Sequence, residues 1–150
     1  MSNKKKYEKK SFESDQSSSD VMAMFFASMR FSSAFEKLSS VAQNVYRDMK
    51  LEYYRQKKKP FPEDRTCFYF NKYIWKNIYH YKNANQISKC INELILLGFI
   101  RCKQDGYTNR TKSIYQYSDK WRNYGTDKFR IEPQEMTISL QRQQKEIMVW

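Results

Sequence analysis

The sequence predicts an α+β domain in which three helices lead into a β-hairpin. Residues 83–97 place apolar side chains at helical spacing on one face and amides and lysine on the other, which indicates an amphipathic helix. Two short β-prone runs follow directly, Phe99–Gln104 and Lys112–Tyr117, around the turn residues Asp105 and Gly106. A helix that continues into such a ribbon is typical of a winged helix-turn-helix, with a three-helix core and a hairpin wing.

The first core helix is expected from residue 40 to about residue 54, after a short helical turn at 34–38. Within it, Val41, Val45 and Met49 repeat every four residues. Ser40 and Gln43 have capping-box spacing, so Ser40 is the expected N-cap.

A basic loop over residues 55–65, with three consecutive lysines and two prolines, separates the first helix from the second. The β-prone run Cys67–Phe70 is a candidate for a small third strand beside the hairpin. Asn71 is placed to cap a second helix at 72–78, whose candidate core residues are Tyr73, Ile74 and Ile78.

The third helix is expected to begin after Asn83, which caps it, with Gln86 at the third helical position. Gly98 is placed to end it in a left-handed conformation. Its apolar face comprises Ala84, Ile87, Ile91, Leu94 and Ile95, and its polar face carries Asn85, Gln86, Lys89 and Asn92.

Positive charge is concentrated in the part of the chain that is expected to fold. The formal net charge is +12, and residues 31–124 hold eighteen basic and eight acidic residues. A basic folded domain favours a polyanion as partner, most often nucleic acid. Charge that serves only solubility, or an acidic protein partner, is the alternative.

The chain is expected to have three parts. Residues 1–20 form a basic, serine-rich leader without core residues and are predicted to be disordered. Residues 21–124 form the domain, and residues 125–150 form a tail that is disordered, partly helical or a dimer or partner contact. The apolar run 21–29 is far shorter than the roughly 20 residues that span a bilayer, so we expect a cytoplasmic protein without a membrane partner.

The sequence gives no indication of catalysis, a metal site or a cofactor. Its three cysteines include no CxxC pair, and His80 is the only histidine. No phosphate-binding glycine loop, HExxH motif or nucleophile with a second histidine is present, so we expect a protein that is not an enzyme.

Three segments resemble a known group of proteins. They are Phe35-x-x-Leu38-Ser39-x-x-Ala42-x-x-Val45-Tyr46, then Asn83 to Ile100 with Ile91-Asn92-Glu93-Leu94-Ile95 and Gly98-Phe99-Ile100, and finally Ile114-Tyr115-x-Tyr117-Ser118-Asp119-Lys120-Trp121. Over about residues 22–124 the chain resembles winged-helix DNA-binding proteins of phages, plasmids and conjugative elements of Gram-positive bacteria. It is also similar to the amino-terminal domains of plasmid replication initiators.

The resemblance implies a mobile-element transcription regulator or a replication accessory factor. Leu96 and Leu97 stand where the group often has charged residues, which leaves a homodimer open.

Duplex DNA is therefore the expected partner, with the helix at about 83–97 in the major groove and the hairpin at about 99–117 on the backbone. Amides suit adenine edges, and basic side chains suit phosphate or guanine. The expected base contacts are Asn85, Gln86, Lys89 and Asn92. The expected backbone contacts are Lys82, Asn83, Arg101, Lys103, Arg110 and Lys112. The alternative is a protein-binding module that inhibits a host protein, such as a nucleic-acid-guided nuclease.

Overall fold

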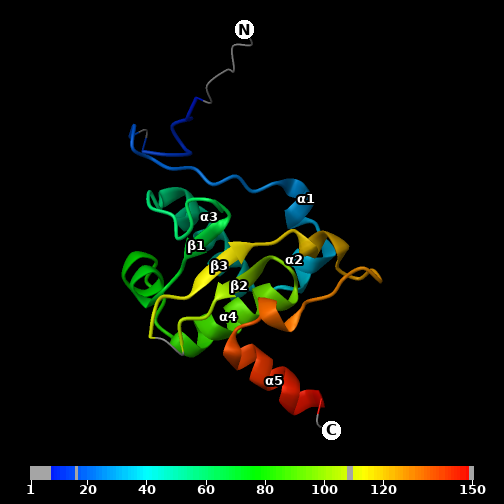
Figure 1. Cartoon of the computed structure of the whole chain (residues 1–150). Coiled ribbons are helices and arrows are strands. Elements are labelled where there is room, and N and C mark those ends of the chain that lie inside the picture. Colours follow the sequence, from blue (N-terminus) through cyan, green and yellow to red (C-terminus); the bar gives the residue numbers. More distant parts are fainter. Residues whose placement is uncertain (1–7, 16, 108–109, 149–150) are drawn as a thin grey trace.

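The computed structural model describes residues 8–15, 17–107 and 110–148, and it combines helices with a three-stranded antiparallel sheet (Figure 1). This confirms the predicted α+β class and is compatible with a winged helix. The elements in chain order are α1 (Ala27–Arg30), α2 (Ser33–Lys37), α3 (Ser40–Arg55), β1 (Cys67–Tyr69), the π-helix η1 (Tyr73–Ile78), α4 (Ala84–Leu96), β2 (Ile100–Gln104), β3 (Ile114–Tyr117), the 3-10 helices η2 (Lys120–Asn123) and η3 (Pro133–Glu135), and α5 (Ile138–Met148).

The hairpin strand β3 lies in the centre of the sheet, between β1 and β2. Tyr115 of β3 is paired with Phe68 of β1 on one side and with Cys102 of β2 on the other. These three side chains point into the core, where they meet the helices. The predicted third strand is thus confirmed, and it joins the hairpin through β3.

The N-cap of α3 is Ser39, one residue before the predicted Ser40. The Ser39 hydroxyl accepts a hydrogen bond from the amide of Ala42, and Gln43 donates to carbonyls of the preceding turn, including that of Phe35. The carboxylate of Glu93 on α4 accepts from both the amide and the hydroxyl of Ser39, the latter at 3.0 Å. A negative charge at a helix N-terminus is favourable, so this contact joins α4 to α3.

Two predicted core positions are wrong. Tyr73 is 66% exposed, because the segment at 73–78 winds as a π-helix and buries Trp75 instead. Ala84 is exposed at the start of α4, where Cys90 completes the buried face.

The two ends of α4 are as predicted. The Asn83 side chain accepts a hydrogen bond from the amide of Gln86, and Gly98 has a φ of 85°. A Cβ added to Gly98 would lie 2.6 Å from the amide nitrogen of Trp121, so both the left-handed backbone and a close approach require glycine here.

The segment after Gly125, expected to be a tail, folds back onto the domain. Leu140 of α5 is 1% exposed and belongs to the core, and Lys120 forms an ion pair with Glu135 at 2.6 Å. The apolar residues of α5 are too widely spaced in the sequence to predict that this helix packs on the domain. A single buried leucine, Leu140, anchors it among the described side chains. In the expected leader, residues 8–15 and 17–20 form turns that are largely exposed, whereas residues 1–7 and 16 lie outside the described part. No described helix is long and apolar enough to span a bilayer.

Gly98→Ala is expected to destabilise the fold more than Gly125→Ala, which provides a matched control. Both glycines have positive φ, but a Cβ at Gly125 meets nothing within 4 Å. Gly125→Ala therefore costs only the left-handed backbone, about 1–2 kcal/mol, while Gly98→Ala adds a steric cost of about 1–3 kcal/mol. Urea unfolding followed by circular dichroism measures both; equal losses would contradict the close approach at Trp121.

Candidate nucleic-acid interface

The amino-terminal half of α4 presents a strip of free polar side chains. Ile87, Cys90 and Ile91 are buried, and helical geometry turns Asn85 and Lys89 to the opposite side, where both are exposed. Within the described residues, these two side chains form no hydrogen bond or ion pair. Gln86 is also exposed, and its side chain is equally unpartnered there. The strip thus offers two amides and one ammonium group to a ligand.

Asn92 shares this face but is not free. It is half-buried, and its side-chain oxygen accepts a hydrogen bond of 3.0 Å from the hydroxyl of Thr137. Asn92, a predicted base contact, therefore holds the segment that leads into α5. The sequence prediction missed it because Thr137 lies 45 residues away along the chain.

The tip of the β2–β3 hairpin brings basic residues to the start of α4. A groove of about 440 Å³ lies between this tip, the beginning of η1 and α4. Lys72, Arg110 and Lys112 line it together with Ser88 of α4. All three basic residues are exposed, and the Lys112 ammonium lies 5.3 Å from the centre of the Tyr69 ring.

Lys72 was not among the predicted contacts. Lys72 follows β1 in the chain. Because β1 pairs with β3, the chain just after β1 lies beside the hairpin tip. The only sequence signal for this was the third-strand candidate, whose partner strand the sequence did not specify.

Arg101 and Lys103 do not join this groove. Ile100 and Cys102 of the same strand are in the core, so Arg101 projects from the other face of the sheet. There its guanidinium donates to the side chain of Gln116, which donates in turn to Asp64 at 2.7 Å. Lys103 lies on the same side. The pKa of the Asp64 carboxyl is lowered mainly by hydrogen bonds from Thr66, and the nearby charge of Lys103 lowers it further. These two predicted backbone contacts are therefore separated from the strip on α4.

Lys82 and Asn83 lie at the beginning of α4 and are exposed. Asn83 uses its side-chain oxygen as the helix cap, and its side-chain nitrogen has no hydrogen-bond partner among the described residues. Lys82 precedes it, so a cation stands beside the free N–H groups of the first turn.

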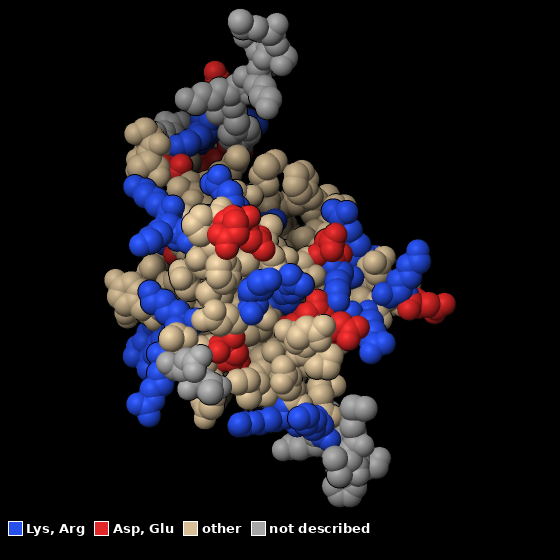
Figure 2. Space-filling view, viewed as in Figure 1, with Lys and Arg blue, Asp and Glu red and all other residues tan. Residues whose placement is uncertain are grey.

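The positive charge is unevenly distributed over the surface. Figure 2 shows basic side chains along the left edge, over η1 and the hairpin tip, whereas acidic and basic side chains alternate across the middle of this face. Lys76 belongs to η1, and Lys72, Arg110 and Lys112 line the groove between η1 and the hairpin tip.

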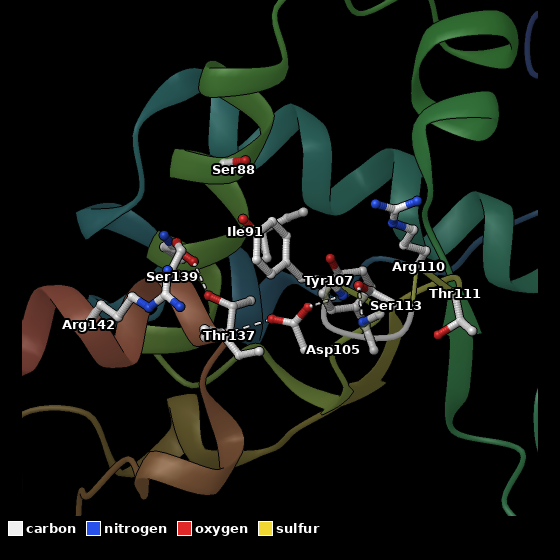
Figure 3. A pocket seen from close by; sticks show the side chains of 14 residues that line it. Ser88, Ile91, Asp105, Tyr107, Arg110, Thr111, Ser113, Thr137, Ser139 and Arg142 are labelled. Atoms are coloured by element: carbon white, nitrogen blue, oxygen red, sulfur yellow. Dashed lines mark hydrogen bonds between the residues drawn. The ribbon is translucent and has the colours of Figure 1, made fainter.

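A second groove, of about 510 Å³, separates the hairpin from α5 (Figure 3). Ser88 and Ile91 of α4 line its upper side in this view, between Arg110 on the hairpin side and Arg142 on the α5 side. Asp105 also lines it, and its carboxylate accepts hydrogen bonds from the amides of Tyr107 and Ile138, both at 2.9 Å.

The cysteines are placed as core residues. Cys67, Cys90 and Cys102 are at most 4% exposed, and burial raises the pKa of each thiol, that of Cys102 to about 12. In the described ranges, no three or more His, Cys, Asp or Glu side chains are grouped so that they could hold a metal ion.

The chain matches no family model, no curated protein and no solved structure.

The burial of the thiols predicts that the native protein resists thiol reagents. A thiol with a raised pKa holds little of the reactive thiolate at pH 8, and burial excludes the reagent. With a disulfide reagent that releases a chromophore, we expect almost no fast reaction in buffer and three thiols per chain in denaturant. Rapid labelling of one thiol in buffer would contradict the burial of that cysteine.

Proposed function

We propose that this protein is a winged helix-turn-helix protein that binds duplex DNA. In this proposal the amino-terminal half of α4 enters the major groove, and the tip of the β2–β3 hairpin contacts the backbone. The observation that carries it is the free strip on α4, with Asn85 and Lys89, beside a groove lined by Lys72, Arg110 and Lys112.

The chemistry of the strip fits base edges. An asparagine or glutamine amide can form two hydrogen bonds with adenine. Its NH2 group donates to N7, and its oxygen accepts from the N6 amino group. Lys89 can donate to guanine or to phosphate. The exposed amides of the strip have no intramolecular partner. When they dock on a base edge, they therefore exchange only their hydrogen bonds with water.

The chemistry of the hairpin side fits phosphate. Exposed lysine and arginine release counterions from the duplex when they neutralise phosphates, which makes affinity dependent on salt. The contacts proposed here are Lys72, Lys82, Lys89, Arg110 and Lys112, with Asn83 at the helix start. Such a protein would serve a mobile element as a transcription regulator or as a replication accessory factor, as the sequence resemblance implies.

A protein-binding role is the second candidate, and exposed apolar side chains favour it. Met22, Met24, Phe26 and Phe31 are between 52% and 73% exposed, around α1. Clustered exposed apolar side chains are a feature of protein interaction sites. In this case the protein would act on a host protein, such as a nucleic-acid-guided nuclease.

Selection of bound duplexes from a random pool, read by sequencing, tests the first proposal. We expect enrichment of a short motif and tight, salt-sensitive binding of the enriched duplex. If no duplex is retained at low salt while a host protein co-purifies in stoichiometric amount, the protein-binding role replaces DNA binding.

Asn85→Ala and Gln86→Ala are expected to reduce discrimination and not general affinity. A good bidentate base contact is worth about 1–3 kcal/mol, so preference for the selected site over a random duplex should fall by roughly 5- to 150-fold. Competition between the two duplexes, followed by fluorescence anisotropy, measures this ratio. A uniform loss on both duplexes would assign these amides to backbone contacts.

Arg110→Ala/Lys112→Ala is expected to weaken binding to every duplex and to flatten its salt dependence. Five phosphate contacts correspond to a log–log slope on the order of −4 to −5, and loss of two should reduce it by about 2. The matched control is Arg101→Ala/Lys103→Ala, which removes the same charge from the other face of the sheet. Equal effects of the two double variants would show that net charge, and not the hairpin tip, determines affinity.

A further inference from the structure

The first turn of α5 is fixed to both elements of the proposed interface. The hydroxyl of Thr137 donates to Asn92 of α4 and accepts from the amide of Leu140, at 3.0 and 3.1 Å. The amide of Ile138 donates to Asp105 at the base of the hairpin, at 2.9 Å. With Leu140 buried, α5 has a defined direction relative to α4 and the hairpin.

This arrangement places α5 on the flank of α4 that is opposite the hairpin tip. In Figure 3, Arg142 of α5 and Arg110 of the hairpin lie on opposite sides of the groove, with Ser88 and Ile91 between them. Figure 1 shows α5 projecting from the lower side of the molecule, where α4 also lies.

The outward side of α5 is basic where it is described. Arg142 and Lys145 are both exposed, and a spacing of three residues puts them on one side of the helix. Within the described side chains, which do not include that of Glu146, neither Arg142 nor Lys145 forms an ion pair.

The anchoring of α5 also gives an unfavourable charge a hydrogen-bond donor. Asp105 is the one acidic side chain among the residues that line the groove between the hairpin and α5. Its carboxylate accepts the amide of Ile138, at the N-terminus of α5, and the partial positive charge there offsets its repulsion of an anion.

We propose that α5 is a second backbone-contacting arm, with Arg142 and Lys145 on the flank of α4 opposite the hairpin. This inference rests on the proposed binding of duplex DNA. A helix in the major groove is bordered by the two sugar-phosphate strands, about 12 Å apart across the groove. The hairpin tip would contact one strand and α5 the other. Because the backbone at the start of α5 is already ordered, binding costs the rotamer entropy of these side chains but little backbone entropy.

The test is the variant Arg142→Ala/Lys145→Ala in the full chain, compared with Lys57→Ala/Lys58→Ala. The control removes the same charge from the exposed loop between α3 and β1, which lies in the upper part of Figure 1, far from α5. Binding of a fluorescent 25-base-pair duplex would be measured by anisotropy at 50 and 200 mM salt, with circular dichroism to confirm folding.

We expect the α5 variant to bind more weakly than the wild type and its salt slope to fall by about 2. The ratio of wild-type to variant affinity should accordingly be roughly tenfold larger at 50 mM than at 200 mM salt. Hydroxyl-radical footprinting on a selected duplex should lose protection at one edge of the site in this variant, and at the other edge in Arg110→Ala/Lys112→Ala.

The outcomes separate this inference from the proposed function. A wild-type protein that binds no duplex removes both. A wild-type protein that binds, with an α5 variant that behaves like the Lys57/Lys58 control, overturns only the second arm. Tighter binding by the α5 variant also overturns it, because α5 would then obstruct the duplex.

Discussion

The direct passage from α4 into β2 through Gly98 and Phe99 is the constraint on which the rest of the structure depends. Phe99 is fully buried, and its ring lies 5.3 Å from that of Tyr46 and 6.0 Å from that of Trp121, between centroids. The backbone on both sides is fixed as well, because Gly98 accepts from the amide of Trp121 and Phe99 accepts from the amide of Ser118, each at 3.0 Å. One turn of chain thus holds α4, the hairpin and the closing 3-10 helix together, and it determines which faces of α4 and of the hairpin lie side by side.

The polar residues of this protein divide into those that the fold uses and those that it leaves free. Glu52 is 5% exposed and accepts hydrogen bonds from Arg55 and Tyr79, both at 3.0 Å. Arg101 is likewise engaged with Gln116 on the outer face of the sheet. Buried charges without partners are costly, so the partners of Glu52 stabilise it within the fold. Arg101 is engaged in the network on the outer face, and neither group is free for a ligand. Exposed cations also lie elsewhere, but those at the start of α4 and at the hairpin tip flank the unpartnered amides of α4, and this grouping is the basis of the proposed polyanionic partner.

The sequence predicted the elements well and the contacts between them less well. Periodicity and turn chemistry located α3, α4, the hairpin and the turn at Gly98, because each signal comes from neighbouring residues. The Ser39 cap was missed by one residue, since Glu93 of another helix stabilises it. For the same reason, sequence could not show that Asn92 is engaged by Thr137 or that Lys72 joins the hairpin tip. Local patterns determine which side chains a helix exposes, but long-range packing determines which of them remain free.

The two candidate partners would meet different parts of the molecule. The free amides and cations belong to α4 and the hairpin, in the lower middle of Figure 1, while the exposed Met and Phe residues precede, join or follow α1, at its upper right. The apolar surface is bordered by cations, since Arg30 lies 5.7 Å from the Phe31 ring centre and Lys50 lies 5.5 Å from that of Phe25. A second copy of this surface would bring like charges together, so it disfavours a symmetric dimer there. Because the surfaces share no residue, substitutions on α4 and substitutions around α1 act independently, and a protein that uses both is physically consistent with this fold.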